Sequence, residues 1–181
     1  MNVIAIVGLE SIKDADGNVK YFAETFLNNI KTWRRDNPDA EIKIFDGRSY
    51  SVLNTPVSSL WKDIANAYGE KGIDQILYSG HSDSDKLYWI SKARHDLPDT
   101  ERFLWERDWN FTYNKDASIK LMGCQTGGQE GKKWPKCIAQ SIADSSGVIV
   151  WGFTSKSSQK KRDGGYYQTP DIGGYVKFVK D

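Results

Sequence analysis

The sequence predicts an α/β fold with a mostly parallel central sheet and helices on both of its faces. Short apolar runs of strand length alternate along the chain with longer stretches in which apolar residues recur every three or four positions. This alternation is typical of parallel sheets, because a helix carries the chain back between neighbouring strands. The 181 residues contain no internal repeat and no evident linker, so we expect a single domain spanning residues 1–181.

Each expected element rests on its own pattern. Residues 21–35 predict a helix, because apolar side chains recur three or four positions apart and Pro38 follows. Residues 133–146 predict another helix, with Pro135 in its first turn. The aromatic-rich residues 91–116 are expected to form an irregular helix. The other expected elements are strands at 3–7, 41–45, 73–78, 119–122, 148–153 and 175–179, a short strand or hairpin arm at 86–90, a helix at 56–72 and a polar loop at 10–18.

Composition narrows the classes of function. Hydrophobic residues make up 39% of the chain, and Lys+Arg 25 against Asp+Glu 24 leaves a formal net charge of +1. This balance argues against a nucleic-acid-binding or membrane-surface role, and no apolar run reaches the length of a membrane span. Two cysteines do not make a disulfide framework, so we expect a reducing, cytoplasmic compartment. The cysteines and histidines lack the spacing of a zinc site, and we expect no metal and no cofactor.

Cys124 stands between an apolar run and a glycine-rich segment. Gly123 precedes it, and Gly127 and Gly128 follow shortly after. The thiol is therefore expected at the carboxyl end of a strand, where ligand and catalytic sites of open α/β sheets gather. A free cysteine is commonly a small buried residue, and that is our expectation for Cys137, which adjoins the apolar face of an expected helix.

His81 ends a second apolar run in the same manner. Residues 73–78 are followed within three positions by His81, and Gly80 precedes it. The other histidine, His95, is flanked by charged residues and is expected at the surface. If the two apolar runs are parallel strands, His81 and Cys124 come to the same edge of the sheet. An imidazole in that position can take the proton of a thiol, which is what a cysteine nucleophile needs.

The two strand ends together resemble a known family. The segments 77–81 (LYSGH) and 121–127 (LMGCQTG) look like the His and Cys strand ends of the caspase-like (clan CD) cysteine peptidases. The residues of these two motifs are most similar to those of the bacterial CHAT, gingipain and toxin self-processing protease branches. The resemblance spans residues 3–155 and implies a three-layer αβα caspase-like sandwich, with residues 156–181 as a loop and an edge-strand tail.

The resemblance also implies a catalytic apparatus. Cys124 would attack the scissile carbonyl and form a thioester, and His81 would move the protons. In this family the oxyanion is held by the backbone amides of the cysteine and of the glycine after the histidine. Here Ser82 occupies that second position and the glycine stands before the histidine, as Gly80. A serine amide donates a hydrogen bond as a glycine amide does, so Cys124, Ser82 and Gly80 are the expected oxyanion residues.

The expected substrate is a peptide or protein. By position in the family, the pocket beside the cysteine strand would be walled by Trp151 and Thr154. Asp83 or Asp85 would meet a basic substrate side chain, and Lys156 or Arg162 would meet an acidic one. The sequence does not choose between the two. Caspase-like sheets often pair through an edge strand, so the strand expected at 175–179 could join two copies of the chain.

Two other functions fit the same residues. A catalytically inactive caspase-like domain could bind a protein partner through its many aromatic side chains, and Ser82 in place of the family's glycine favours this alternative. A flavodoxin-like or nucleotide-binding domain could instead use the glycine-rich segment after Cys124 as an anion cradle. The sequence predicts the peptidase first and keeps the protein-binding module as its alternative.

Overall fold

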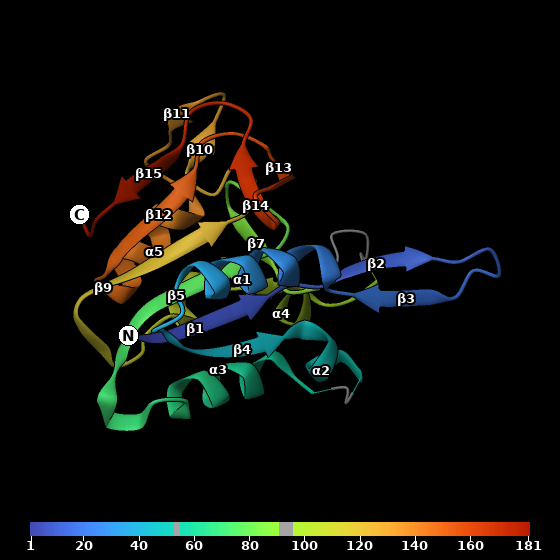
Figure 1. Cartoon of the computed structure of the whole chain (residues 1–181), viewed down its shortest axis with the longest axis horizontal. Helices are drawn as coiled ribbons and strands as arrows, with labels where there is room; N and C mark the ends of the chain where they lie inside the picture. The colour runs from blue at the N-terminus through green and yellow to red at the C-terminus, as the bar shows by residue number, and fades with distance from the viewer. Residues whose placement is uncertain (53–54, 91–95) are drawn as a thin grey trace.

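The computed structural model describes residues 1–52, 55–90 and 96–181. Its central sheet has six strands in the order β15-β12-β9-β5-β1-β4 (Figure 1). Neighbouring strands run parallel except for β12 and β15, which are antiparallel. The expected mixed α/β class with a mostly parallel sheet is thus confirmed. The strands of this sheet are β1 (Asn2–Val7), β4 (Glu41–Asp46), β5 (Ile73–Ser79), β9 (Tyr113–Met122), β12 (Ile149–Phe153) and β15 (Tyr175–Phe178).

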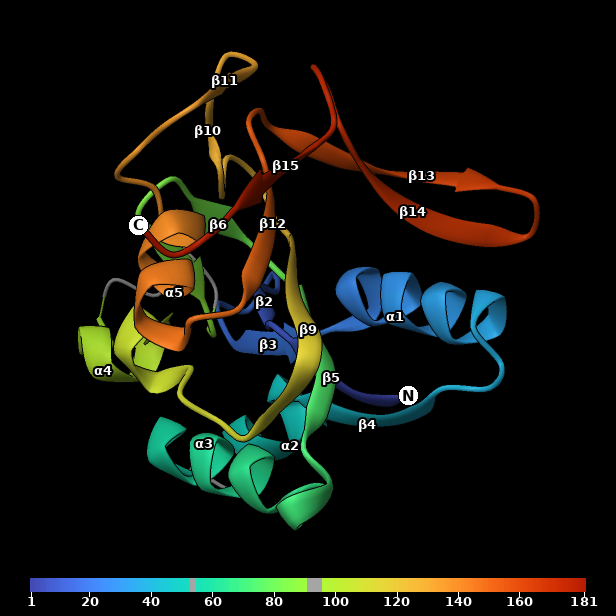
Figure 2. The same ribbon diagram turned by 90° about the vertical axis from the view of Figure 1, so that its left-hand side faces the viewer.

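Helices pack on both faces of the sheet. Helix α1 (Glu24–Asp36) lies on one face, and α3 (Val57–Asn66) and α5 (Ile138–Ser146) lie on the other (Figure 2). The smaller elements are β2 (Glu10–Lys13), β3 (Val19–Phe22), α2 (Gly47–Val52), η1 (Gly69–Lys71), β6 (Ser82–Asp83), β7 (Lys86–Tyr88), α4 (Asp99–Arg102), β8 (Phe103–Leu104), η2 (Glu106–Asp108), β10 (Gly128–Gln129), β11 (Lys132–Lys133), β13 (Ser157–Arg162) and β14 (Gly165–Pro170).

The alternation of side chains along the strands creates two hydrophobic clusters. In β1, Val3 and Ala5 point toward α1, where they join Ile30. Ile4 and Ile6 point the other way and join the cluster that contains α3 and α5. Because successive side chains of a strand face opposite sides, an apolar strand such as β1 fills both clusters. This explains why its run of apolar residues is continuous rather than alternating.

Several expected elements differ in the structure. The helix expected at residues 21–35 begins at Glu24, after β3, and the helix expected at residues 56–72 ends at Asn66. Residues 10–18 are not simply a loop, because β2 and β3 form a hairpin that projects from the body of the molecule (Figure 1). The last helix begins at Ile138 rather than at residue 133, since the segment before it forms the short β10–β11 pair. Residues 96–116 contain short helical turns and strands rather than one irregular helix, and residues 91–95 lie outside the described residues.

The C-terminal tail also contains more structure than expected. Residues 157–170 form the antiparallel β13–β14 hairpin, which lies on the same side of the sheet as α1 (Figure 2). Asp163 and Gly164 form its turn, with φ of 48° and 73°. Two successive positive φ values match the twist of a tight hairpin, and Asp-Gly is a preferred pair there. The edge strand expected at residues 175–179 is present as β15 (Tyr175–Phe178).

We expect Ile30→Ala to lower the free energy of unfolding by about 2 to 5 kcal/mol, because it would leave a cavity where α1 meets the sheet. The Ile30 side chain is 0% exposed. The matched control is Ile172→Ala, which removes the same atoms from a side chain that is 56% exposed and should cost about 0.5 kcal/mol or less. Urea titration monitored by circular dichroism measures both. Equal effects of the two substitutions would contradict this placement of α1.

Candidate functional site

The register of β5 and β9 brings His81 and Cys124 to one edge of the sheet. These two strands are parallel neighbours, and Ser79 is paired with Met122 at the end of their ladder. His81 lies two residues after Ser79, and Cys124 lies two residues after Met122. Both side chains therefore follow the same point of the sheet, at the carboxyl ends of adjacent strands.

A hydrogen bond joins the two strand-end loops directly. The hydroxyl of Ser82 donates to the backbone carbonyl of Cys124 at 2.7 Å. Gly123 makes this contact possible, because a Cβ at that position would lie 2.2 Å from Ser82 Oγ. Distances that short do not occur between real atoms, so a side chain at 123 and the hydroxyl at 82 exclude each other.

Further hydrogen bonds tie the Cys124 loop to the end of β12. The Gln125 amide donates to the Ser155 carbonyl at 2.8 Å, and the Gly127 amide donates to the Phe153 carbonyl at 2.7 Å. The buried Thr126 hydroxyl oxygen accepts a hydrogen bond from the Phe153 amide at 3.0 Å. Gln125 itself has φ of 58°, a left-handed conformation that is uncommon outside glycine. The turn after the cysteine is thus held in place by its neighbours.

The Cys124 sulfur lies against Ser157. The Ser157 amide lies 3.3 Å from Sγ, its hydroxyl oxygen 3.5 Å and its carbonyl oxygen 3.6 Å. The Ser157 hydroxyl also accepts a hydrogen bond from the Gln168 amide group at 2.8 Å. Within the described part of the chain, no hydrogen bond joins the Cys124 sulfur to His81. Cys124 is partly exposed, whereas Cys137 is buried in the core as expected.

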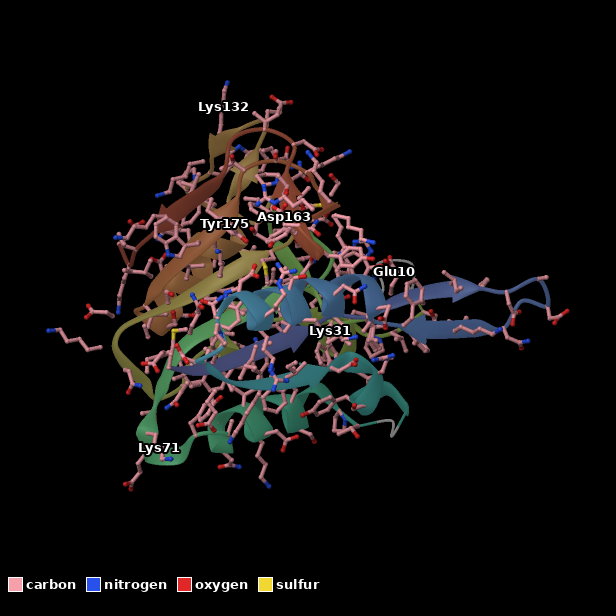
Figure 3. The ribbon with its side chains drawn as sticks, viewed as in Figure 1. Glu10, Lys31, Lys71, Lys132, Asp163 and Tyr175 are labelled. Carbon is pink, nitrogen blue, oxygen red and sulfur yellow. The ribbon has the colours of Figure 1, made fainter. Side chains whose placement is uncertain are left out.

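The His81 side chain is held by Glu10. Its Nε2 forms a hydrogen bond with the Glu10 carboxylate, and its ring packs edge-on against Phe26 with centroids 5.1 Å apart. A carboxylate can only accept hydrogen bonds, so Nε2 carries a proton. In the neutral imidazole, Nδ1 is then the basic nitrogen. Glu10 lies at the base of the projecting β2–β3 hairpin (Figure 3).

The His81 backbone is fixed as well. Its carbonyl accepts hydrogen bonds from the Tyr88 amide at 3.0 Å and from the Tyr78 hydroxyl. Burial raises the pKa of the Tyr78 phenol well above its ordinary value, so the hydroxyl remains a donor. Gly80 leaves room for that hydroxyl, since a Cβ there would approach it to 2.5 Å. Gly80 therefore allows close packing beneath His81.

The structure places the expected substrate-binding residues in several different surroundings. Asp83 accepts a hydrogen bond from the Tyr88 hydroxyl at 2.9 Å, and Asp85 lies in the exposed turn that follows β6. Thr154 is 1% exposed. Trp151 is paired with Lys120, four residues before Cys124, and lines a separate cavity of about 270 Å³. Trp151 and Cys124 are thus not brought together.

A larger cavity of about 350 Å³ lies between α1, β9 and the β13–β14 hairpin. Lys120 and Tyr175 line it, with the Lys120 ammonium 4.5 Å from the centre of the Tyr175 ring. Burial lowers the pKa of Lys120. Asn29 and Gln168 also line the cavity, and the Asn29 amide group donates to Gln168 at 3.3 Å. This cavity therefore adjoins the residues that contact Ser157.

Two residues of the site were not expected from the sequence. Glu10 follows β1, which is the other neighbour of β5 and is paired with it up to Val7 and Ser79. A third strand ending at the same edge was the signal that could have identified Glu10. Ser157 gives no comparable signal, because it is one of several polar residues in a serine-rich segment. His95 lies outside the described residues.

Comparison of the chain with protein-family models, with curated proteins and with solved structures finds no match. Among residues 1–52, 55–90 and 96–181, no group of three or more His, Cys, Asp or Glu side chains could hold a metal ion. No helix in the same residues is long and apolar enough to cross a membrane.

We expect Gly123→Ala to destabilise the protein by about 2 kcal/mol or more, because its Cβ would collide with Ser82. In a Ser82→Gly background the collision disappears, and the nearest remaining contact is the Gly80 carbonyl at 3.1 Å. The cost of Gly123→Ala should then fall by at least about 1 kcal/mol, a coupling that thermal unfolding of the four variants measures. The control is Gly174→Ala, where a Cβ meets nothing within 4 Å. If the stability changes of Gly123→Ala and Ser82→Gly simply add in the double variant, the contact between residues 123 and 82 is contradicted.

Proposed function

We propose that the chain is a cysteine endopeptidase with a three-layer αβα caspase-like sandwich, in which Cys124 and His81 form the catalytic dyad. The β5–β9 register carries the proposal, because it sets the thiol and the imidazole two residues beyond the paired Ser79 and Met122. A nucleophile and a base at adjacent strand ends are the arrangement that covalent catalysis by cysteine requires.

The proposed reaction proceeds in two halves. His81 Nδ1 takes the Cys124 thiol proton, and the sulfur attacks the carbonyl carbon of the scissile bond. The resulting tetrahedral intermediate collapses as the C–N bond breaks and His81 returns the proton to the leaving amine. Water then attacks the thioester, giving its proton to His81, and the C–S bond breaks to release the carboxylic acid and the thiol. The Cys124 and Ser82 amides are the proposed oxyanion donors.

Glu10 has a proposed role as a positioning residue. The carboxylate accepts a hydrogen bond from Nε2–H, which leaves Nδ1 as the base. It also favours the imidazolium that forms when the thiol loses its proton. The ring is further confined by its edge-on contact with Phe26. Together these contacts would limit rotation of His81 during the reaction.

The thiol must turn for this chemistry to occur. Cys124 Sγ lies against Ser157 in the conformation described, so turnover would require rotation about the Cα–Cβ bond toward His81. Hydrogen bonds between a catalytic thiol and its base commonly become short only when substrate is bound. The Ser157 contacts equally favour the alternative function, a catalytically inactive caspase-like domain that binds a protein partner. The two functions differ in what Cys124→Ala does.

We expect the wild-type protein to cleave members of a tetrapeptide library that releases 7-amino-4-methylcoumarin, and Cys124→Ala to abolish the cleavage. Cys137→Ala, the matched control, should retain it, because that thiol is sealed in the core. Iodoacetamide should label Cys124 in the native protein at least about tenfold faster than Cys137, as mass spectrometry of tryptic peptides would show. A wild-type protein without turnover and with equally slow labelling of both thiols would exclude the peptidase.

We expect Glu10→Gln to lower kcat by about tenfold or more, because a neutral amide no longer stabilises the His81 imidazolium. The control is Glu24→Gln, which removes a carboxylate whose side chain is 58% exposed and paired with Lys31 on α1. Initial rates on the best library peptide measure both variants. Equal rates for Glu10→Gln and Glu24→Gln would remove Glu10 from the proposed mechanism.

A further inference from the structure

The peptide unit between Cys124 and Gln125 is held at both of its polar ends. Its carbonyl oxygen accepts the Ser82 hydroxyl at 2.7 Å, and its N–H donates to the Ser155 carbonyl at 2.8 Å. One partner follows the His81 strand end and the other follows β12. The plane of this single peptide unit is thus fixed between two segments that are distant in sequence.

This peptide unit needs such support. Gln125 has φ of 58°, and a left-handed conformation costs a residue with a side chain roughly 1 to 2 kcal/mol. Rotation of the peptide plane would relieve that cost if nothing held the carbonyl. Removing the Ser82 hydroxyl would leave a carbonyl without its donor, an outcome that typically costs about 1 to 3 kcal/mol. Both effects would then favour a different orientation.

Ser82 is buried, and its neighbour Gly123 leaves space for its hydroxyl. The residue is 5% exposed, so it is not an ordinary surface serine. Gly123 provides the space, because any Cβ there would lie 2.2 Å from the hydroxyl oxygen and 3.0 Å from the Ser82 Cβ. Within the described part of the chain, the backbone N–H of Cys124 forms no hydrogen bond.

We propose that Ser82 is a positioning residue whose hydroxyl fixes the peptide unit between Cys124 and Gln125. Because this unit meets the preceding one at the Cys124 Cα, it also holds the Cys124 amide in place relative to the Ser82 amide. The inference rests on the proposed peptidase function, in which these two amides bind the oxyanion. One side chain then links the two donor residues, so the serine that replaces the family's glycine has a function of its own. Because an oxyanion exists only in the transition state, loss of this link should act on kcat and leave KM largely unchanged.

The test compares Ser82→Ala with Ser158→Ala, a control that removes the same atom from an exposed serine in β13. Hydrogen exchange of the Gln125 amide, measured by NMR, should be about tenfold faster or more in Ser82→Ala, because the peptide plane is no longer held on its carbonyl side. The coumarin-peptide assay should give a kcat roughly ten- to a hundredfold lower with KM within about twofold of wild type. Ser158→Ala should change neither quantity.

The two readouts separate this inference from the function on which it rests. Unchanged Gln125 exchange in Ser82→Ala would overturn the positioning role whatever the activity. Faster exchange with an unchanged kcat would also overturn the positioning role, since the hydrogen bond from Ser82 to the Cys124 carbonyl would then not serve catalysis. Faster exchange together with a wild-type protein that cleaves no peptide would contradict the peptidase and the catalytic part of the inference, while establishing the hydrogen-bonded clamp itself.

Discussion

The pairing of β5 with β9 is the constraint on which the rest of the site depends. In a sheet, a shift of one residue turns every side chain of a strand to the opposite face. Such a shift would exchange Ile76 and Leu77 between the two hydrophobic clusters and would move His81 out of step with Cys124. The apolar contacts that stabilise the sheet therefore also fix the relative position of His81 and Cys124.

Two glycines allow side-chain hydroxyls to approach the backbone closely at this edge of the sheet. Gly80 makes room for the Tyr78 hydroxyl beneath His81, and Gly123 makes room for the Ser82 hydroxyl beside Cys124. In both cases the glycine is needed for close approach and not for an unusual φ, since neither has a positive value. The contacts that the two glycines permit are hydrogen bonds from side-chain hydroxyls to backbone carbonyls.

The central strands were predictable because burial on both faces leaves a continuous apolar run, as in β1. The β13–β14 hairpin was not expected, since its first strand is entirely polar and mostly exposed. Its Asp163-Gly164 turn was a local signal that could have identified it. The start of α5 was placed too early because Pro135 suits the first turn of a helix but equally suits the turn that precedes α5 here.

The site was predictable to the same extent and for the same reason. His81 and Cys124 follow strands whose apolar pattern is strong, so their common edge could be inferred. Glu10 belongs to a hairpin with a weak pattern, and Ser157 reaches the thiol through tertiary packing that local sequence does not encode. The side chains that contact His81 and Cys124 thus escaped prediction, whereas the common sheet edge of His81 and Cys124 did not.

The contact between Cys124 and Ser157 has a consequence for the way the protein forms during translation. The thiol's surroundings are completed by a hairpin that ends at Pro170, so they cannot assemble until that segment has left the ribosome. Because a domain generally folds as a unit, strands β1, β4 and β5 alone do not supply the environment of the cysteine. That environment forms only when residues 157–170 can pack against the Cys124 loop.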